Sequence, residues 1–309
     1  MTKTPELSVV MSVYNGAAFL RRSIDSILAQ EGVDLEFIIV NDGSTDGSNE
    51  ILGEYAERDR RIRVLEHENL GLTKSLIRGC AGARGEYIAR QDVGDISLEG
   101  RLLKQLECIR LNPDAALVSC GTRFIGPCGE QLYDLIPNPA DATERLLALD
   151  LDVIRGPSHH GCALFRRAAY NEAGGYRPAF YYAQDLDLWI RLAEKGPHII
   201  VPELLYEAAL TAGAISNIYR KEQIETTGMI LECARLRRKG MSERALVEKA
   251  ATEPQGRRPA TTRLDQARFL YFIGSCLNRK GDPLARDYFK QALLQYPLHL
   301  KAALRLVLK

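Results

Sequence analysis

The segment that most constrains the fold is FIIVNDGSTD at residues 37–46, where a short apolar run ends abruptly in a polar cluster. An apolar run without alternation predicts a strand buried on both faces, as in a parallel sheet covered by helices. Asp42 follows at the carboxyl edge of that sheet, where open α/β folds bind their ligands. Ser44 or Thr45 is expected to cap the next helix and to leave backbone N–H groups nearby. The junction therefore suits a nucleotide.

The first 120 residues alternate between apolar runs and amphipathic stretches. Strands are expected at residues 7–13, 37–40, 61–65, 87–90 and 116–120, and helices at residues 19–30, 51–55, 72–80 and 98–111. Repeated βα units of this size predict a parallel, doubly wound sheet with right-handed crossovers. After residue 121 the pattern loosens into proline-marked loops, which we interpret as the start of a substrate-facing region.

The charges are distributed unevenly along the chain. The net charge is +1, but residues 221–309 contain 18 Lys and Arg against 9 Asp and Glu, so residues 1–220 are acidic overall. A basic C-terminal region indicates an acidic partner, an anionic membrane surface or simply a solvated helical face. A nucleic-acid partner is not expected.

The cysteines and the apolar stretches indicate the compartment. Seven cysteines without a Cys-x-x-Cys pair fit neither a zinc site nor a small disulfide framework, so we expect reduced packing residues. The apolar stretch at residues 7–13 is too short for a signal peptide, and no later stretch reaches the length of a membrane span. We expect a cytoplasmic protein, at most peripheral to the inner face of a membrane.

Five motifs stand in order along the chain: SVVMSVYN at residues 8–15, VNDGSTD at 40–46, NLG at 69–71, ARQD at 89–92 and QDLDLWIR at 184–191. With these motifs, residues 6–220 resemble the family 2 glycosyltransferases. The resemblance implies an α/β GT-A domain at residues 1–220, with a Rossmann-like, mostly parallel sheet flanked by helices. It also implies inverting transfer of a sugar from a nucleotide-diphosphate donor, with a UDP-sugar favoured, to an acceptor hydroxyl in cell-surface glycan or polysaccharide synthesis.

The resemblance assigns the donor site to Val13, Tyr14, Asn15, Asp42 and Asp92. Asp42 suits the N3–H of a uracil, Tyr14 would stack on or flank the base, and Asn15 would satisfy a nearby polar group. Two structural alternatives stay open: Asp42 can make an Asx-turn, and Tyr14 can pack on the sheet.

The resemblance makes Asp185 the general base. An inverting transfer needs one carboxylate to take the acceptor proton, which is worth about 10²- to 10⁴-fold in rate. Asp185 can also be the N-cap of the helix that follows, and Asp187 is a weaker candidate for the base. Trp189 is expected either to form an acceptor platform or to pack in the core.

The metal site departs from the family pattern. Relatives have Asp-x-Asp, whose third residue binds Mg²⁺ or Mn²⁺, but residues 92–95 read DVGD, with Gly94 at that position. Asp92 and Asp95 are therefore the predicted ligands, since Gly94 gives Asp95 the flexibility to approach. Two other arrangements stay open: the metal is held by Asp92 and the diphosphate alone or is dispensable, or the chain is a non-catalytic nucleotide-sugar-binding or scaffold protein.

On the acceptor side, GPSHHG at residues 156–161 precedes an apolar strand that ends at Arg166. No carboxylate or cysteine stands at ligand spacing from the two histidines, which argues against a zinc site. We expect His160 to be a structural or diphosphate-contacting residue. The acceptor is expected to be a glycan or a lipid-linked molecule.

Residues 221–309 are predicted to form a helical extension. Residues 253–262 look like a linker, and residues 264–297 resemble a single tetratricopeptide-like hairpin. One such unit cannot bury its own apolar face, so it must dock on the catalytic domain, a protein partner or a membrane. Residues 298–308 are basic and amphipathic, and docking on protein is favoured over an anionic membrane surface.

Overall fold

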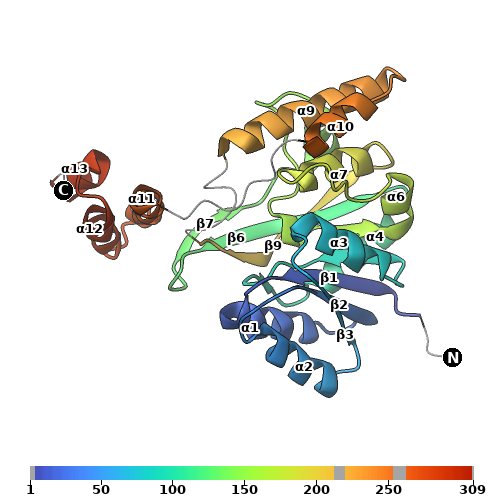
Figure 1. Ribbon diagram of the computed structural model, residues 1–309, viewed down its shortest axis with the longest axis horizontal. Helices are drawn as coiled ribbons and strands as arrows, with labels where there is room; N and C mark the ends of the chain where they lie inside the picture. Colours follow the sequence, from blue (N-terminus) through green and yellow to red (C-terminus); the bar gives the residue numbers. More distant parts are fainter. Residues whose placement is uncertain (1–3, 212–219, 253–261, 308–309) are drawn as a thin grey trace. The chain divides into compact units, whose positions relative to one another are not determined.

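The computed structural model describes residues 4–211, 220–252 and 262–307. Its strands form one sheet in the order β3-β2-β1-β4-β8-β6-β9-β5, with β7 paired to β6 (Figure 1). The strands are β1 (Leu7–Val13), β2 (Leu35–Asp42), β3 (Ile62–His67), β4 (Tyr87–Arg90), β5 (Ile96–Ser97), β6 (Leu117–Ile125), β7 (Gln131–Leu135), β8 (Leu164–Arg166) and β9 (His198–Ala209). The predicted mostly parallel α/β sheet is confirmed.

The sheet is parallel where the sequence repeats βα units. Strands β3, β2, β1 and β4 run in one direction, and every residue of β1, β2 and β4 is buried. Burial on both faces explains why these strands show no alternation. The short strand β8 then pairs antiparallel with both β4 and β6. Strand β6 therefore runs in the same direction as β4, with β8 between them.

Helices cover both faces of this sheet. They are α1 (Ala17–Leu28), α2 (Ser48–Arg58), α3 (Leu72–Ala81), α4 (Arg101–Leu111), α5 (Ala142–Leu147), α6 (Arg167–Glu172), α7 (Gln184–Ala193), α9 (Arg220–Arg238) and α10 (Arg244–Thr252). Figure 1 shows α3 on the opposite side of the parallel strands from α1 and α2. On the side of α3, Leu76, Leu188 and Ile230 bring α3, α7 and α9 into one apolar core.

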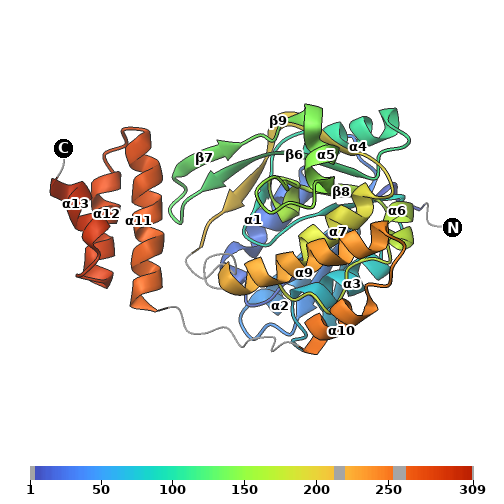
Figure 2. The same ribbon diagram turned by 90° about the horizontal axis from the view of Figure 1, so that it is seen from above.

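The chain divides into two compact units. The first comprises residues 1–122, 135–208 and 225–253, and the second comprises residues 123–134, 209–224 and 254–309. In the second unit, α11 (Arg263–Arg279), α12 (Ala285–Gln295) and α13 (Leu300–Val307) share a core with Leu132 of the β6–β7 hairpin (Figure 2).

The predicted C-terminal helices are therefore present, whereas a domain boundary at residue 220 and the kinship with tetratricopeptide repeats stay predictions. Residues 253–261 of the expected linker lie outside the described residues. Thr262 is described. It is the N-cap of α11 and forms a reciprocal capping box with Asp265. Among the helices that the structure describes, none is both long and apolar enough to cross a membrane.

Candidate active site

The turns after β1 and β2 are bonded to each other. Asn15 has a left-handed backbone (φ 50°), donates its N–H to the Ser44 hydroxyl (3.0 Å) and accepts the Thr45 N–H on its side chain (2.8 Å). The first N–H groups of α1 are used as well, because Asp46 and Ser48 accept them. The expectation that Ser44 or Thr45 caps the next helix is wrong, since Gly47 is the cap residue of α2.

Asp42, the last residue of β2, is buried and holds the loop before α3. Its carboxylate accepts the backbone N–H of Leu70 (2.8 Å) and of Gly71 (3.0 Å). The local side-chain bond at this junction is made instead by Asn41, which accepts the N–H of Ser44 three residues on (3.1 Å). Asp42 is therefore a long-range anchor between two loops at the carboxyl edge of the sheet.

Two residues predicted to bind the nucleotide sugar, Val13 at the end of β1 and Tyr14 directly after it, differ in exposure. Val13 is fully buried, whereas 46% of Tyr14 is exposed. Val13 can therefore contact a ligand only through its backbone, while the ring of Tyr14 is available to a planar group. Their roles as donor-binding residues stay predictions.

The turn after β4 brings two carboxylates to one place. Gly94 has φ +96° and donates its N–H to the Ser23 hydroxyl (2.8 Å). The buried Tyr206 of β9 ties both ends of the turn, because its hydroxyl accepts the N–H of Asp92 (3.2 Å) and donates to the Asp95 carboxylate (2.9 Å). The positive φ of Gly94 thus forms a turn in which Asp95, rather than residue 94, stands beside Asp92.

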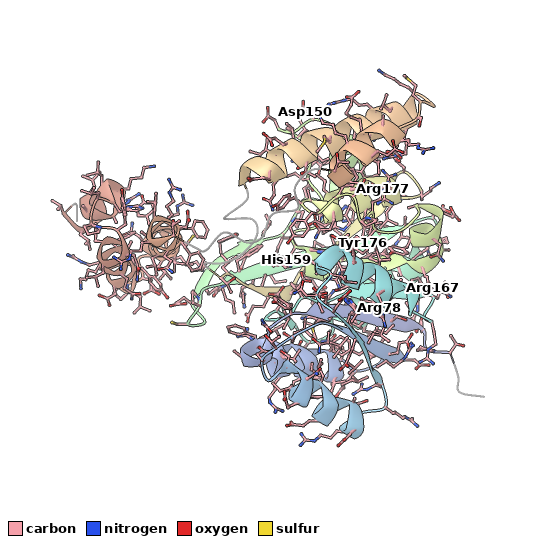
Figure 3. The ribbon with its side chains drawn as sticks, in the orientation of Figure 1. Arg78, Asp150, His159, Arg167, Tyr176 and Arg177 are labelled. Carbon is pink, nitrogen blue, oxygen red and sulfur yellow. The ribbon has the colours of Figure 1, made fainter. Side chains whose placement is uncertain are left out.

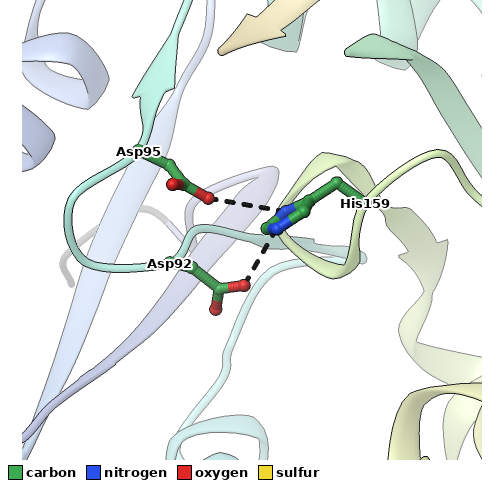
Figure 4. A group of neighbouring side chains, drawn as sticks. All are labelled: Asp92, Asp95 and His159. Carbon is green, nitrogen blue, oxygen red and sulfur yellow. Dashed lines mark ion pairs between the residues drawn. The ribbon is translucent and has the colours of Figure 1, made fainter. Parts of the chain in front are cut away.

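His159 completes this group. Its Nδ1 lies 3.4 Å from Oδ2 of Asp95 and 4.0 Å from Oδ2 of Asp92 (Figure 4), and one ligand atom from each residue lies within 4.8 Å of the other two. Burial lowers the pKa of His159, but the carboxylates of Asp95 and then Asp92 outweigh it and hold that pKa above its ordinary value. Nδ1 of His159 also accepts the Gly161 N–H (3.1 Å). With His159 neutral, its imidazole nitrogen and the two carboxylate oxygens are a donor set for a divalent cation.

Two fully buried arginines hold Asp92 and the neighbouring backbone of the cluster in place. Arg90 contacts Asp92 at 2.7 Å and also donates to the Val10 carbonyl. Arg101 donates to the carbonyls of Arg90 (2.8 Å) and Gly161 (2.7 Å). Burial raises the pKa of Asp92, but the charges of Arg90, His160, His159 and Arg101 together outweigh it and hold the pKa below its ordinary value. Asp92 is thus kept ionised, as a cation ligand must be.

His160 lies behind the cluster. Its Nε2 lies 2.7 Å from the hydroxyl of Tyr176 (labelled with His159 in Figure 3) and accepts a bond from Arg90 (3.4 Å). Burial, followed by the charge of Arg90, lowers the pKa of His160 to about 4, so it is neutral near pH 7. Trp189 is also buried, 5.9 Å from His160 between ring centroids, and a Cβ on Gly156 would lie 2.7 Å from its ring.

The packing alternative for Trp189 is therefore what the structure has. The assignment of His160 and Trp189 to the acceptor side stays a prediction.

Asp185 is the second residue of α7 and is partly exposed. The cap position belongs to Ala183, whose φ is 52°, so Asp185 is not the N-cap. Its carboxylate accepts its neighbour Leu186 N–H (2.9 Å), and its charge contributes to the raised pKa of His159. Asp187, by contrast, is buried and paired with Arg191. Asp185 thus lies within electrostatic reach of the cluster, while Asp187 stabilises the helix.

Sequence reasoning missed His159 as a partner of the two carboxylates. It lies far from them along the chain, and its approach depends on Tyr206, whose ring stacks on His159 at 5.5 Å between centroids. The signal in the sequence was the His159–His160 pair, which by itself does not say which ring turns toward the carboxylates.

Comparison with known proteins places the chain in a family. Residues 8–174 match the model of Glycosyl transferase family 2. The "Putative glycosyltransferase EpsE" of Bacillus subtilis is 32% identical over 203 residues, which cover 63% of this chain and 69% of that protein. An "Uncharacterized glycosyltransferase" of Haemophilus influenzae is 29% identical over 242 residues, which cover 74% of this chain and 73% of the relative.

Among solved structures, S. aureus TarS 1-349 superposes with a TM-score of 0.58 at 14% identity, covering 94% of this chain and 89% of that one. At this identity the likeness shows the shared fold, which confirms the predicted GT-A architecture. The chain belongs to glycosyltransferase family 2.

Proposed function

We propose that this protein transfers a sugar from a UDP-sugar donor to an acceptor hydroxyl with inversion at the anomeric carbon. The observation that carries the proposal is the convergence of Asp92, Asp95 and His159 at the carboxyl edge of the sheet. TarS, which shares the fold, has been crystallised with UDP and with UDP-GlcNAc, and this supports a uridine nucleotide.

In this proposal Asp92, Asp95 and His159 hold Mn²⁺ in preference to Mg²⁺. The donor set fits a divalent cation, and its imidazole nitrogen suits a transition ion better than Mg²⁺, which takes oxygen ligands. A bound cation would neutralise the negative charge that develops on the departing diphosphate. Asp95 thereby takes the place that Gly94 leaves vacant in the Asp-x-Asp pattern.

The donor base is assigned to the two bonded turns at the ends of β1 and β2. Asp42 is held rigidly by Leu70 and Gly71, so its remaining lone pairs are pre-oriented toward an N–H of the ligand. The half-exposed ring of Tyr14 supplies a flat apolar surface for a base. Asn15 would contribute by fixing the turn rather than by contact, since its side chain already bonds Thr45.

Asp185 is assigned as the general base. Its carboxylate would accept the proton of the acceptor hydroxyl as that oxygen attacks the anomeric carbon from the face opposite the nucleotide. The half-exposed position of Asp185 leaves it open to an acceptor, unlike the buried Asp187. The acceptor class that we propose is a glycan or lipid-linked molecule of a cell-surface or secreted polysaccharide.

Thermal unfolding tests the donor and metal assignments together. UDP, GDP, CDP and dTDP are each added with and without Mn²⁺, and a ligand at about 100 times its Kd adds roughly 2.7 kcal/mol, a shift of a few degrees. Of the four nucleotides, we expect only UDP to raise the Tm, and we expect Mn²⁺ to enlarge that shift. Asp95→Asn should remove the Mn²⁺ increment, whereas Asp150→Asn, a matched change at an exposed position, should keep it.

The same experiment separates the enzyme from a scaffold. Absence of a Tm shift with all four nucleotides, in a protein with a cooperative transition, would refute the donor site and favour a non-catalytic role for the fold. A UDP shift that Mn²⁺ leaves unchanged would keep the donor site and remove the cation from the proposal.

A further inference from the structure

The second unit carries an apolar surface that its own core does not use. Five side chains form this C-terminal apolar surface and are 57–80% exposed. They are Leu294 of α12, Leu298 in the following loop, and Leu300, Leu304 and Val307 of α13. In a single small unit, that many largely exposed aliphatic side chains mark a contact surface.

Helix α13 is amphipathic, and the positions of its buried residues show which face is exposed, here called the open face. Leu300, Leu304 and Val307 stand at i, i+4 and i+7 and so share one face. The opposite face packs inward, with Ala302 fully buried and Leu306 against the core of the second unit. In Figure 2, α13 lies beside α12 and α12 beside α11, so α13 is a terminal helix of this layer. The exposed leucines are therefore not required to hold α13 on the unit.

The charges around this surface are mostly positive, and the acid Asp287, two turns before Leu294 on α12, is paired with Lys290 (3.0 Å). Residues 288–309 contain four Lys and Arg and no Asp or Glu. Lys301 and Arg305 are exposed on α13 and each is adjacent in sequence to a residue of the open face, Leu300 and Leu304. Both cations therefore lie along one side of the apolar stripe, about 100° round the helix from Leu300 and Leu304. An apolar stripe bordered by cations is typical of a helix that lies in the interface of an anionic bilayer.

We propose that the C-terminal apolar surface binds an anionic lipid membrane. The leucines would enter the boundary between head groups and acyl chains, while Lys301 and Arg305 remain at the level of the lipid phosphates. A bilayer takes up side chains from a projecting short helix without a shaped complement, whereas a protein partner would need a groove matched to it. The sequence alone favours docking on protein, but the excess of positive charge on this surface favours phosphate head groups over an apolar protein surface.

Vesicle sedimentation of the full chain tests this proposal. One set of vesicles contains phosphatidylglycerol and phosphatidylcholine, and the other contains phosphatidylcholine only. We expect sedimentation with the anionic vesicles, weakened by high salt, and little or none with the neutral vesicles.

Three variants locate the contact. Replacing both cations (Lys301→Gln with Arg305→Gln) should weaken partition into anionic vesicles about 30-fold, at roughly 5-fold per cation. Leu304→Glu should abolish it. The control is Leu111→Glu on α4, where an equally exposed leucine (81%) lies outside the second unit, and this variant should bind like the unchanged protein. Far-UV circular dichroism and Tm confirm that each variant is folded.

The proposal is overturned if the folded wild-type chain does not sediment with anionic vesicles, an outcome that would point to a protein partner instead. It is equally overturned if Leu304→Glu binds as tightly as the control. Since the readout is partition, neither result depends on whether the protein transfers sugar.

Discussion

Both edges of the parallel sheet hold a carboxylate beside an arginine, buried at Glu36 and partly exposed at Asp92, yet the two edges are built differently. At the amino edge, Glu36 of β2 accepts the Ser8 hydroxyl (2.7 Å), the Arg84 N–H (2.8 Å) and side-chain bonds from Arg63 and Arg84. These bonds link β1, β2, β3 and the loop before β4. The carboxylate is thus enclosed by the chain's own donors, which is the arrangement of a structural anchor.

At the carboxyl edge, Arg90 and Tyr206 also bond the carboxylates of Asp92 and Asp95, but one ligand atom from each of Asp92, Asp95 and His159 lies within 4.8 Å of the other two. Like charges in such proximity repel, and a fold keeps them together only where something else repays that cost. A buried carboxylate next to an arginine is therefore not by itself a sign of function. The convergence of several ligand atoms on one point is the distinguishing feature.

Cavities do not single out the carboxyl edge. A cavity of about 540 Å³ lies at the amino edge, lined among others by Glu6, Arg84 and Arg167 (Arg167 is labelled in Figure 3). Its lining mixes both charges, and Arg84 and Arg167 are committed to Glu36 and to the Gly85 carbonyl. We give more weight to the carboxyl edge, because chemistry requires groups that converge rather than volume alone.

The largest effect is expected on kcat, from a substitution at the carboxyl edge. Asp185→Asn should lower kcat about 10²- to 10⁴-fold and leave the Tm unchanged, because the amide cannot accept the acceptor proton and Asp185 makes only a local bond. The measurement is turnover with UDP-sugars as donors, together with calorimetry. Asp187→Asn is the control, and it should lower the Tm, since it breaks the buried pair with Arg191. Undiminished turnover in Asp185→Asn would refute its assignment as the base.

The second prediction concerns the stability of the fold after a substitution at the amino edge. Glu36→Gln should reduce the free energy of unfolding by about 2–3 kcal/mol and leave kcat unchanged at a temperature where the variant is folded. The cost is below that of breaking a fully buried pair, because Arg63 and Arg84 are 34% and 51% exposed and stay hydrated. Urea unfolding gives the stability. A loss of transfer without a loss of stability would place Glu36 in the active site and erase the contrast between the edges.

The third prediction concerns the turn that carries the carboxylates. Gly94→Asp restores the family's usual residue, but we expect it to lower stability by about 1–2 kcal/mol and not to strengthen Mn²⁺ binding. The backbone has φ +96°, while a Cβ would meet only Phe19 at 3.8 Å, so the cost is strain rather than collision. Gly94→Ala should cost the same. Tighter Mn²⁺ binding by Gly94→Asp at unchanged stability would show that Asp95 is not the replacement ligand.

The sequence was informative where local pattern and strand order suffice. The bounds of β1 (Leu7–Val13) and β4 (Tyr87–Arg90) agree with the prediction, because a buried parallel strand is read from its apolar run alone. The family motifs likewise placed Asp42 and Asp92 at strand ends.

Two other features depend on contacts between distant segments. The position of β8 between β4 and β6 comes from pairing across the fold, which a three-residue strand does not specify. His159 faces the carboxylates and His160 does not. The ring of His159 stacks on Tyr206, whereas His160 is buried against Tyr176. Neither partner can be read from the neighbouring sequence.

The smallest effect is a pH dependence of the amino edge. Burial raises the pKa of Glu36, but bonds from Arg63, from the Arg84 N–H and from Ser8 outweigh it and hold the pKa below its ordinary value of 4.5. A depressed pKa means that the stabilisation is present above pH 4.5 and is lost as the pH falls through the pKa of the folded state. The stability gap between wild type and Glu36→Gln should therefore narrow as the pH is lowered from 7 to below 4.5. Urea unfolding at both ends of that range measures the gap, and a gap that stays constant or widens would show that Glu36 is not the ionised anchor of this edge.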